Sequence, residues 1–269
     1  MVIRDLGQLS GTVLLYGGPY SNLAATKALL MLADEQCIPL SNRVCTGDVV
    51  AYGADAEATW ALVAKAGGIV VAGNCERQLA ARAQGCGCGF EEGTTCDLLS
   101  KGWYDHAQRS LSGDALTEMA QVPDMAVFTH TGRRIAVIHG GVRNISRFLW
   151  PSGSDDEFND EIKYIEQEVG EIDVVVAGHC GLAFQRQIGS VTWLNAGVVG
   201  LPPHDGRPET RYATLDATGR IVIHRLVYDP APTVKAMEHA RLVQGYHRAL
   251  ETGIWPSEDV LPLPLRRAV

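Results

Sequence analysis

Two features that would place the chain in other functional classes are missing from this sequence of 269 residues. No apolar stretch approaches the roughly 20 residues needed to span a bilayer, so we expect no membrane association through a spanning helix. Positive charge is also in deficit, because 23 Lys and Arg stand against 31 Asp and Glu and give a formal net charge of -8. Such a surface disfavours extended contact with nucleic acid, which depends on Lys and Arg at phosphates. A small phosphate ester held by a local metal charge remains compatible with it.

Signals that would divide the chain or export it are also missing. No repeat, low-complexity tract or linker rich in Pro, Gly and Ser interrupts the sequence, and 46% hydrophobic with 20% charged residues are ordinary values for a globular protein. We therefore expect one domain over residues 1–269. Residues 1–6 lack a signal-peptide pattern, and seven cysteines, an odd number, do not favour a disulfide framework. The expected location is cytoplasmic.

Three cysteines differ from the others because they lie in or beside a glycine-rich stretch: Cys86, Cys88 and Cys96. Their spacing, C-x-C-x7-C, matches none of the common zinc arrangements, and no fourth ligand is close in sequence. We expect free thiols in a loop. An unusual metal or redox site and a disulfide are the alternatives that the spacing leaves open.

The order of predicted elements indicates an α/β protein. Strands and helices alternate over residues 12–16, 22–33, 44–46, 55–66 and 69–72, which favours a parallel sheet with right-handed crossovers. Residues 76–123 are predicted to be mostly helical around the cysteine loop. Later strands are predicted at residues 125–129, 134–138, 173–177, 184–188, 191–194, 210–216 and 220–227. Helices are predicted at residues 155–169 and 232–250, and a Pro-rich tail follows.

Four short motifs each end an apolar, β-branched run. They are Gly47-Asp48, Gly73-Asn74-Cys75-Glu76, His139-Gly140 and Gly178-His179. Short runs of this kind indicate buried strands. The Asp, Asn and His residues at their ends are hard metal ligands, and the pattern predicts that they meet at one edge of a sheet.

The order GD, GN, HG, GH resembles the calcineurin-like metallophosphoesterases, a superfamily of two-metal phosphoric-ester hydrolases. The resemblance covers about residues 12–227. It implies two mixed β-sheets flanked by helices, an α/β (α+β) sandwich of four layers. It also implies that residues 76–123 form a helical, substrate-facing lid segment and that residues 230–269 form a C-terminal helix and tail.

One of the family's two metal sites keeps all of its ligands in this sequence. By the resemblance, its ligands are Asp48, Asn74, His139 and His179. We therefore expect one divalent metal ion, zinc, iron or manganese. Thiols of Cys75 and Cys180 near this ion would favour zinc or iron over magnesium.

The other metal site has lost its own ligands. The family opens with Asp-x-His, but Gly18 stands where the Asp belongs and Tyr20 where its His belongs. The family closes with Gly-His-x-His, but Gly181 replaces the last His. Tyr20 could bind an ion only weakly or as a phenolate. The resemblance therefore implies a divergent member whose dinuclear site is incomplete.

These residues predict a metal-dependent phosphoric-ester hydrolase, a phosphatase or phosphodiesterase acting on a small phosphorylated substrate. The candidate catalytic residues are Asn74, Cys75 and His139, with Cys75 in the position where many members carry a proton-donating His. The candidate substrate-binding residues are Tyr20, Asn22 and Arg143.

A second hypothesis is a catalytically inactive descendant that binds a phosphorylated ligand or a protein partner and uses the sandwich as a scaffold. Gly18, Tyr20 and Gly181 remove ligands of the same metal together, which favours this hypothesis. The survival of all four ligands of the other site favours the hydrolase. The sequence leaves the oligomeric state open.

Overall fold

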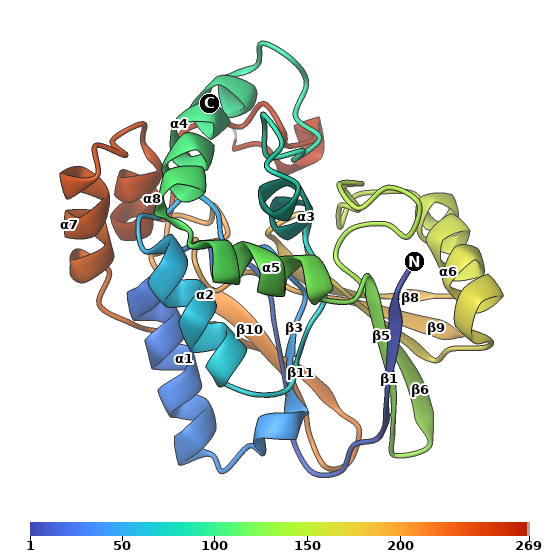
Figure 1. The fold of residues 1–269 in the computed structure, drawn as a ribbon. Helices are drawn as coiled ribbons and strands as arrows, with labels where there is room; N and C mark the ends of the chain where they lie inside the picture. Colours follow the sequence, from blue (N-terminus) through green and yellow to red (C-terminus); the bar gives the residue numbers. More distant parts are fainter. Residues whose placement is uncertain (268–269) are drawn as a thin grey trace.

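Two mixed β-sheets face each other in a sandwich, and helices cover their outer faces (Figure 1). The computed structural model describes residues 1–267. One sheet has six strands in the order β1-β5-β6-β7-β9-β8, and the other has five in the order β11-β10-β2-β3-β4. The fold class predicted from the sequence is confirmed.

The five-stranded sheet contains the predicted βαβαβ unit. Its strands β2, β3 and β4 are parallel, and β10 and β11 add an antiparallel hairpin beside β2. The strands are β2 (Val13–Tyr16), β3 (Arg43–Cys45), β4 (Ile69–Val70), β10 (Thr210–Leu215) and β11 (Ile221–Leu226). The crossovers contain α1 (Leu23–Glu35) and α2 (Ala56–Lys65), and a short 3-10 helix (Leu40–Asn42) precedes β3.

The six-stranded sheet begins with an edge strand that the sequence did not predict. β1 (Ile3–Gln8) pairs in parallel with β5 and is largely exposed, so it lacks the apolar run that marks the buried strands. The other strands are β5 (Met125–His130), β6 (Arg133–Val137), β7 (Val174–Ala177), β8 (Ala183–Ile188) and β9 (Val191–Ala196). Helix α6 (Asp155–Val169) has the predicted bounds.

Side chains alternate between the two faces of each strand, and this alternation produces the four layers. In β2, Val13 and Leu15 point into the core between the sheets, whereas Leu14 packs with α1 and α2 on the outer face. In β5, Phe128 points between the sheets, whereas Val127 packs with Phe158 of α6 on the other outer face. Because successive side chains alternate in a strand, each central strand contributes to two cores.

The segment 76–123 is mostly helical, as predicted, and lies beyond the carboxyl ends of the parallel strands (Figure 1). Its helices are α3 (Asn74–Ala80), α4 (Thr95–Ser110) and α5 (Gly113–Gln121). Thr94 and Ser112 cap α4 and α5 by accepting hydrogen bonds from backbone amides. No helix within residues 1–267 is long and apolar enough to cross a membrane.

The prediction of one C-terminal helix over residues 232–250 is wrong. The structure has two shorter helices instead, α7 (Ala231–His239) and α8 (Tyr246–Thr252). Arg241 and Gly245 have positive φ values of 59° and 111°, which a continuous right-handed helix does not accommodate. A tail follows α8, contains a second 3-10 helix (Leu263–Leu265) and passes beside α4 (Figure 1).

Candidate metal centre

The four motif residues predicted to hold a metal meet where the two sheets deliver their strand ends. Asp48 follows β3 and Asn74 begins α3 just after β4, so both come from the five-stranded sheet. His139 and His179 follow the parallel strands β6 and β7 of the six-stranded sheet. All four side chains are buried. The carboxyl ends of parallel strands are the usual place for ligand sites in open α/β sheets.

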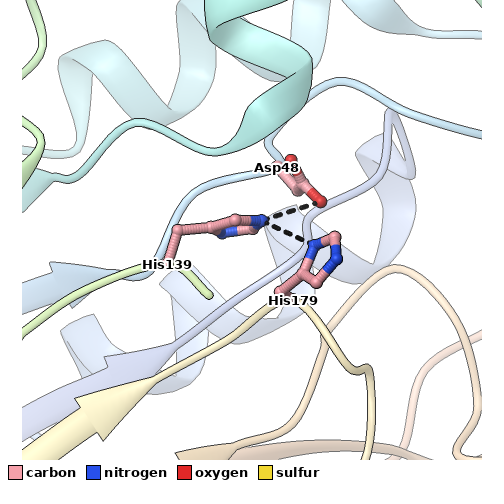
Figure 2. A group of neighbouring side chains, drawn as sticks. All are labelled: Asp48, His139 and His179. Carbon is pink, nitrogen blue, oxygen red and sulfur yellow. Dashed lines mark hydrogen bonds and ion pairs between the residues drawn. The ribbon is translucent and has the colours of Figure 1, made fainter. Parts of the chain in front are cut away.

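Nε2 of His139 lies at the centre of the group (Figure 2). It is 3.3 Å from Oδ2 of Asp48, 3.1 Å from Oδ1 of Asn74 and 3.1 Å from Nδ1 of His179. The other ring nitrogen, Nδ1, lies 2.6 Å from the carbonyl oxygen of Thr46 and donates a hydrogen bond to it. This bond directs Nε2 toward the other three side chains.

The four donor atoms fit a divalent metal ion. One atom each from Asp48, His139 and His179 lie within 4.8 Å of one another, and the amide oxygen of Asn74 adjoins them. A carboxylate oxygen, an amide oxygen and two imidazole nitrogens form a ligand set suited to zinc, iron or manganese.

The charges in the group also favour a cation. Burial alone would raise the pKa of Asp48, but the adjacent His139 lowers it below its usual range. Burial alone would lower the pKa of His139, but the Asp48 carboxylate raises it. Burial and the neighbouring His139 lower the pKa of His179 to about 3, so this ring is neutral. A bound metal ion would replace the proton between Asp48 and His139.

Backbone geometry fixes the positions of these ligands. Asp48 and His179 have φ values of 54° and 61°, in the left-handed region that few non-glycine residues adopt. A Cβ on Gly73 would lie 2.5 Å from the amide nitrogen of Asp48, so only glycine allows the two loops to approach so closely. Strained backbone of this kind is typical of functional sites.

Glu76 holds the two ligand loops together, a role that the sequence did not reveal. Its buried carboxylate accepts hydrogen bonds of 2.8 Å from the backbone amides of Asp48, Val49 and Gly73. Burial, with the negative charge of Asp48, raises the pKa of Glu76 to about 6. An acidic residue three positions after the glycine that precedes a helix is a capping signal, and it could have identified Glu76.

Gly18 and Gly181, which stand where the resemblance places ligands of the other site, differ in how closely they are packed. Gly18 has a φ of 46°, and a Cβ there would lie 2.5 Å from Cγ1 of Val198 and 2.7 Å from Cζ of Tyr20. A Cβ on Gly181 would lie 3.5 Å from the indole ring of Trp255. A side chain at Gly18 would therefore meet close packing, whereas the contact beside Gly181 is an ordinary van der Waals contact.

A cavity of about 50 Å³ opens beside Asp48 and His179. Aromatic residues form a large part of its wall, and Cys88, Cys96 and Cys180 also line it. The aromatic residues that line it are Tyr20, Tyr52, Phe90, Phe148, Trp150, Tyr246 and Trp255. Most of these rings come from segments that are distant in sequence, so no local motif predicts the cavity.

Two of the predicted substrate-binding residues take different places. Tyr20 lines the cavity, and burial together with the charge of Asp48 raises its pKa well above the usual value, so it is a neutral phenol. Asn22 caps α1, where its side chain accepts hydrogen bonds from Ala25 and Thr233 and donates to Gly200 and Tyr228. These four bonds leave Asn22 no free group for a substrate.

Arg143 and Cys75 lie outside the cavity wall. The exposed guanidinium of Arg143 stacks over the ring of Tyr164 in α6, 3.9 Å from its centroid, so the structure does not bring it to the metal ligands. Sγ of Cys75 lies 3.5 Å from Nδ2 of Asn74. Burial, with the charge of Asp48, raises the pKa of the Cys75 thiol well above its usual value.

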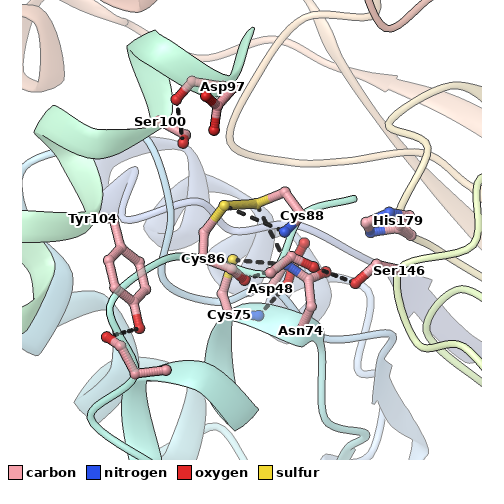
Figure 3. Close-up of a disulfide and its surroundings, with 12 residues drawn as sticks. Asp48, Asn74, Cys75, Cys86, Cys88, Asp97, Ser100, Tyr104, Ser146 and His179 are labelled. Atoms are coloured by element: carbon pink, nitrogen blue, oxygen red, sulfur yellow. Dashed lines mark hydrogen bonds between the residues drawn. A yellow bond between two sulfur atoms is a disulfide. The ribbon is translucent and has the colours of Figure 1, made fainter. Parts of the chain in front are cut away.

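The prediction of free thiols is wrong for two of the three loop cysteines. Cys86 and Cys88 form a disulfide between α3 and α4 (Figure 3), whereas Cys96 is free and buried. Gly87, with a φ of 62°, turns the chain so that the two Cα atoms lie 5.3 Å apart, within the usual disulfide range. Nδ2 of Asn74 donates to the carbonyl oxygen of Cys86, 3.0 Å away, so this loop also orients a metal-ligand candidate.

Comparisons with known proteins agree with this geometry. Residues 21–220 match the calcineurin-like phosphoesterase superfamily domain. A metallophosphoesterase from Sphaerobacter thermophilus has a similar structure, with a TM-score of 0.69 and 18% identity over 91% of this chain and 100% of that one. A hypothetical protein from Pyrococcus horikoshii OT3 has a TM-score of 0.72 and 14% identity over 90% of this chain and 98% of that one. At such low identity the likeness shows the fold alone. No curated protein matches the sequence.

Proposed function

Because the chain belongs to the calcineurin-like phosphoesterase superfamily, we propose that it is a phosphoric-ester hydrolase that works with one divalent metal ion. The observation that carries the proposal is the convergence of Asp48, Asn74, His139 and His179 around one point. The substrate is a small phosphorylated molecule, and zinc, iron or manganese suits the ligand set.

An ion bound there would polarise a phosphoryl oxygen and make an attacking water more acidic. The chain itself supplies rigid positioning. The Thr46 carbonyl orients His139, and Glu76 holds the loop of Asp48 against that of Gly73. Preorganised ligands of this kind stabilise charge without rearrangement during the reaction. Cys75 is a protonated, buried thiol beside Asn74, and its role in this proposal is to position that residue.

A cytoplasmic location is part of the proposal. It is supported by the five free cysteines, four of them buried, and it requires that the one disulfide, Cys86–Cys88, be an exception in a reducing compartment. Free thiols persist in reducing compartments.

The inactive, ligand-binding descendant is the second candidate. The packing of Val198 and Tyr20 against Gly18 favours it, because these side chains occupy the space that a ligand side chain at this position would need. In that case the retained residues would bind a metal ion and a phosphorylated ligand without turnover.

Asp48→Asn tests the hydrolase, because it keeps the size of the side chain and removes its charge. We expect the zinc-loaded parent to hydrolyse bis(p-nitrophenyl) phosphate or another ester in a broad panel, and Asp48→Asn to lose both the activity and the tightly bound ion. Asp160→Asn, an exposed position in α6, is the matched control and should behave like the parent. A parent that binds one ion but cleaves no ester would support the inactive descendant.

A further inference from the structure

Five aromatic side chains at the cavity remain only half-buried: Tyr52, Phe90, Phe148, Trp150 and Trp255. Phe148 stacks on Trp150 with an interplanar angle of 3° and a centroid distance of 5.0 Å. The centroid of Phe148 also lies 4.3 Å from that of the His179 ring. Exposed apolar surface beside a metal centre is typical of a binding surface.

Hydrogen bonds fix Trp255 in this position. Its indole nitrogen donates to the carbonyl oxygen of Pro202 over 2.6 Å, and its backbone amide donates to Nδ1 of His204 over 2.7 Å. Nε2 of His204 lies 2.6 Å from Oε1 of Glu258 in the tail. An indole held from both its ring and its backbone presents a preorganised face, which lowers the entropic cost of binding.

The charge of the cavity is limited. Among the described residues that line it, Asp48 is the only carboxylate, and no Lys or Arg is present. Two arginines on the neighbouring loop are engaged elsewhere, Arg147 with Glu161 at 2.6 Å and Arg143 on Tyr164. A divalent ion with the Asp48 carboxylate leaves a net charge of about +1, and the buried Glu76 carboxylate, 2.8 Å from the Asp48 amide nitrogen, lowers the positive charge of the site further. A monoanion therefore adds the least uncompensated charge, whereas a dianion leaves a buried negative charge without a partner.

The size of the cavity restricts what enters it. A volume of about 50 Å³ corresponds to roughly three or four water-sized positions. That is the scale of the oxygen atoms of one phosphoryl group. The ester substituents of a bound substrate must therefore lie outward, against the half-buried rings.

From this geometry we infer that the site selects a singly charged phosphodiester carrying a flat aromatic group, which stacks on Trp255 and the Phe148–Trp150 pair. This inference rests on the proposed function of the same site. Trp255, Phe148 and Trp150 are its specificity-determining residues, and the charge balance at Asp48 selects diesters over monoesters.

Calorimetric titration of the full-length, zinc-loaded protein at pH 8 separates the requirement for a single negative charge from the requirement for an aromatic ring. The probes are diphenyl phosphate, a monoanion with rings; diethyl phosphate, a monoanion without rings; and phenyl phosphate, a dianion with one ring. Diphenyl phosphate should bind about tenfold tighter than either of the others. Equal or tighter binding of phenyl phosphate would overturn the charge argument, and equal binding of diethyl phosphate would overturn the stacking argument.

Trp255→Ala locates the aromatic site. Base–aromatic stacking of about 1–3 kcal/mol predicts that diphenyl phosphate binds at least about fivefold more weakly to this variant, with diethyl phosphate unchanged. Trp255→Phe should restore most of the binding. Tyr164→Ala, which removes a half-exposed ring on α6, should leave both probes unaffected. Trp150→Ala repeats the test independently of the tail, so that misfolding of one variant does not decide the outcome. Unchanged diphenyl phosphate binding in both tryptophan variants would refute the inference.

Hydrolysis is measured separately with bis(p-nitrophenyl) phosphate. The stated order of binding without any turnover would reject the proposed hydrolase and leave the selectivity intact. Turnover with no preference among the probes would support the hydrolase and reject the inferred selectivity.

Discussion

Gly18→Asp restores the acidic residue with which the family's motif opens, and we predict that it destabilises the protein without creating a second metal site. The Cβ of the new side chain would lie 2.5 Å from Cγ1 of Val198 and 2.7 Å from Cζ of Tyr20. Val198 is β-branched and buried, so it has little freedom to rotate away.

The magnitude follows from three costs. Overpacking of a dense core costs about 1–3 kcal/mol. The φ of 46° adds about 1 kcal/mol for a residue with a Cβ. A carboxylate buried without a partner adds further destabilisation. We expect a loss of about 3–5 kcal/mol in the free energy of unfolding, and a melting temperature lower by roughly 6–15 °C.

Calorimetry and metal analysis of the purified variant check the prediction. Gly18→Ala, which has the Cβ without the charge, should lose about 2–4 kcal/mol of stability. Gly113→Asp is the control, because a Cβ there meets nothing within 4 Å and the position begins α5. A Gly18→Asp protein that melts like its parent and holds a second tightly bound ion would refute the claim that side chains have closed this site.

Three further predictions concern the retained site and its surroundings. Glu76→Gln places amide hydrogens against the backbone amides of Asp48, Val49 and Gly73, so we expect a loss of about 2–4 kcal/mol in the free energy of unfolding in urea, together with weaker zinc binding. Glu168→Gln, on the exposed face of α6, should change neither property, and a Glu76→Gln variant with parental stability would contradict the role of Glu76. Zinc at a few hundred to a thousand times its dissociation constant should stabilise the parent by about 3–4 kcal/mol relative to protein in chelator, whereas Asp48→Asn should have the same melting temperature with and without zinc. A parental melting temperature that is unchanged by the chelator would argue against a bound ion. Thiol titration in denaturant should find five thiols before reduction and seven after it, and seven before reduction would show that Cys86 and Cys88 are not joined.

The sequence predicted the buried elements well because apolar runs and glycine motifs are local signals. β2, β3 and β7 were found from β-branched runs, and α6 from its acidic, amphipathic pattern. β1 was not predicted because an edge strand that is exposed at most positions has no such run. The break between α7 and α8 was not predicted because the apolar spacing continues through Leu242 and Val243. The left-handed conformation of Gly245 is a property of the backbone that this spacing does not reveal.

The candidate site could also be predicted only in part. The metal-ligand candidates each sit in a glycine-containing motif at a strand end, so their convergence could be predicted. The aromatic walls could not, because Phe90, Phe148 and Trp255 come from three loops that only the tertiary fold brings together. The positions of Asn22 and Arg143 also depend on distant partners, Thr233 for the first and Tyr164 for the second.

Metal content tests the central claim most directly. The protein is purified without chelator, dialysed against excess zinc and then against metal-free buffer, and its metal is measured by mass spectrometry together with protein concentration. One ion per chain, absent from Asp48→Asn and retained in Asp160→Asn, is the predicted result. Two tightly bound ions in the parent, or none, would contradict the account of a single retained metal site.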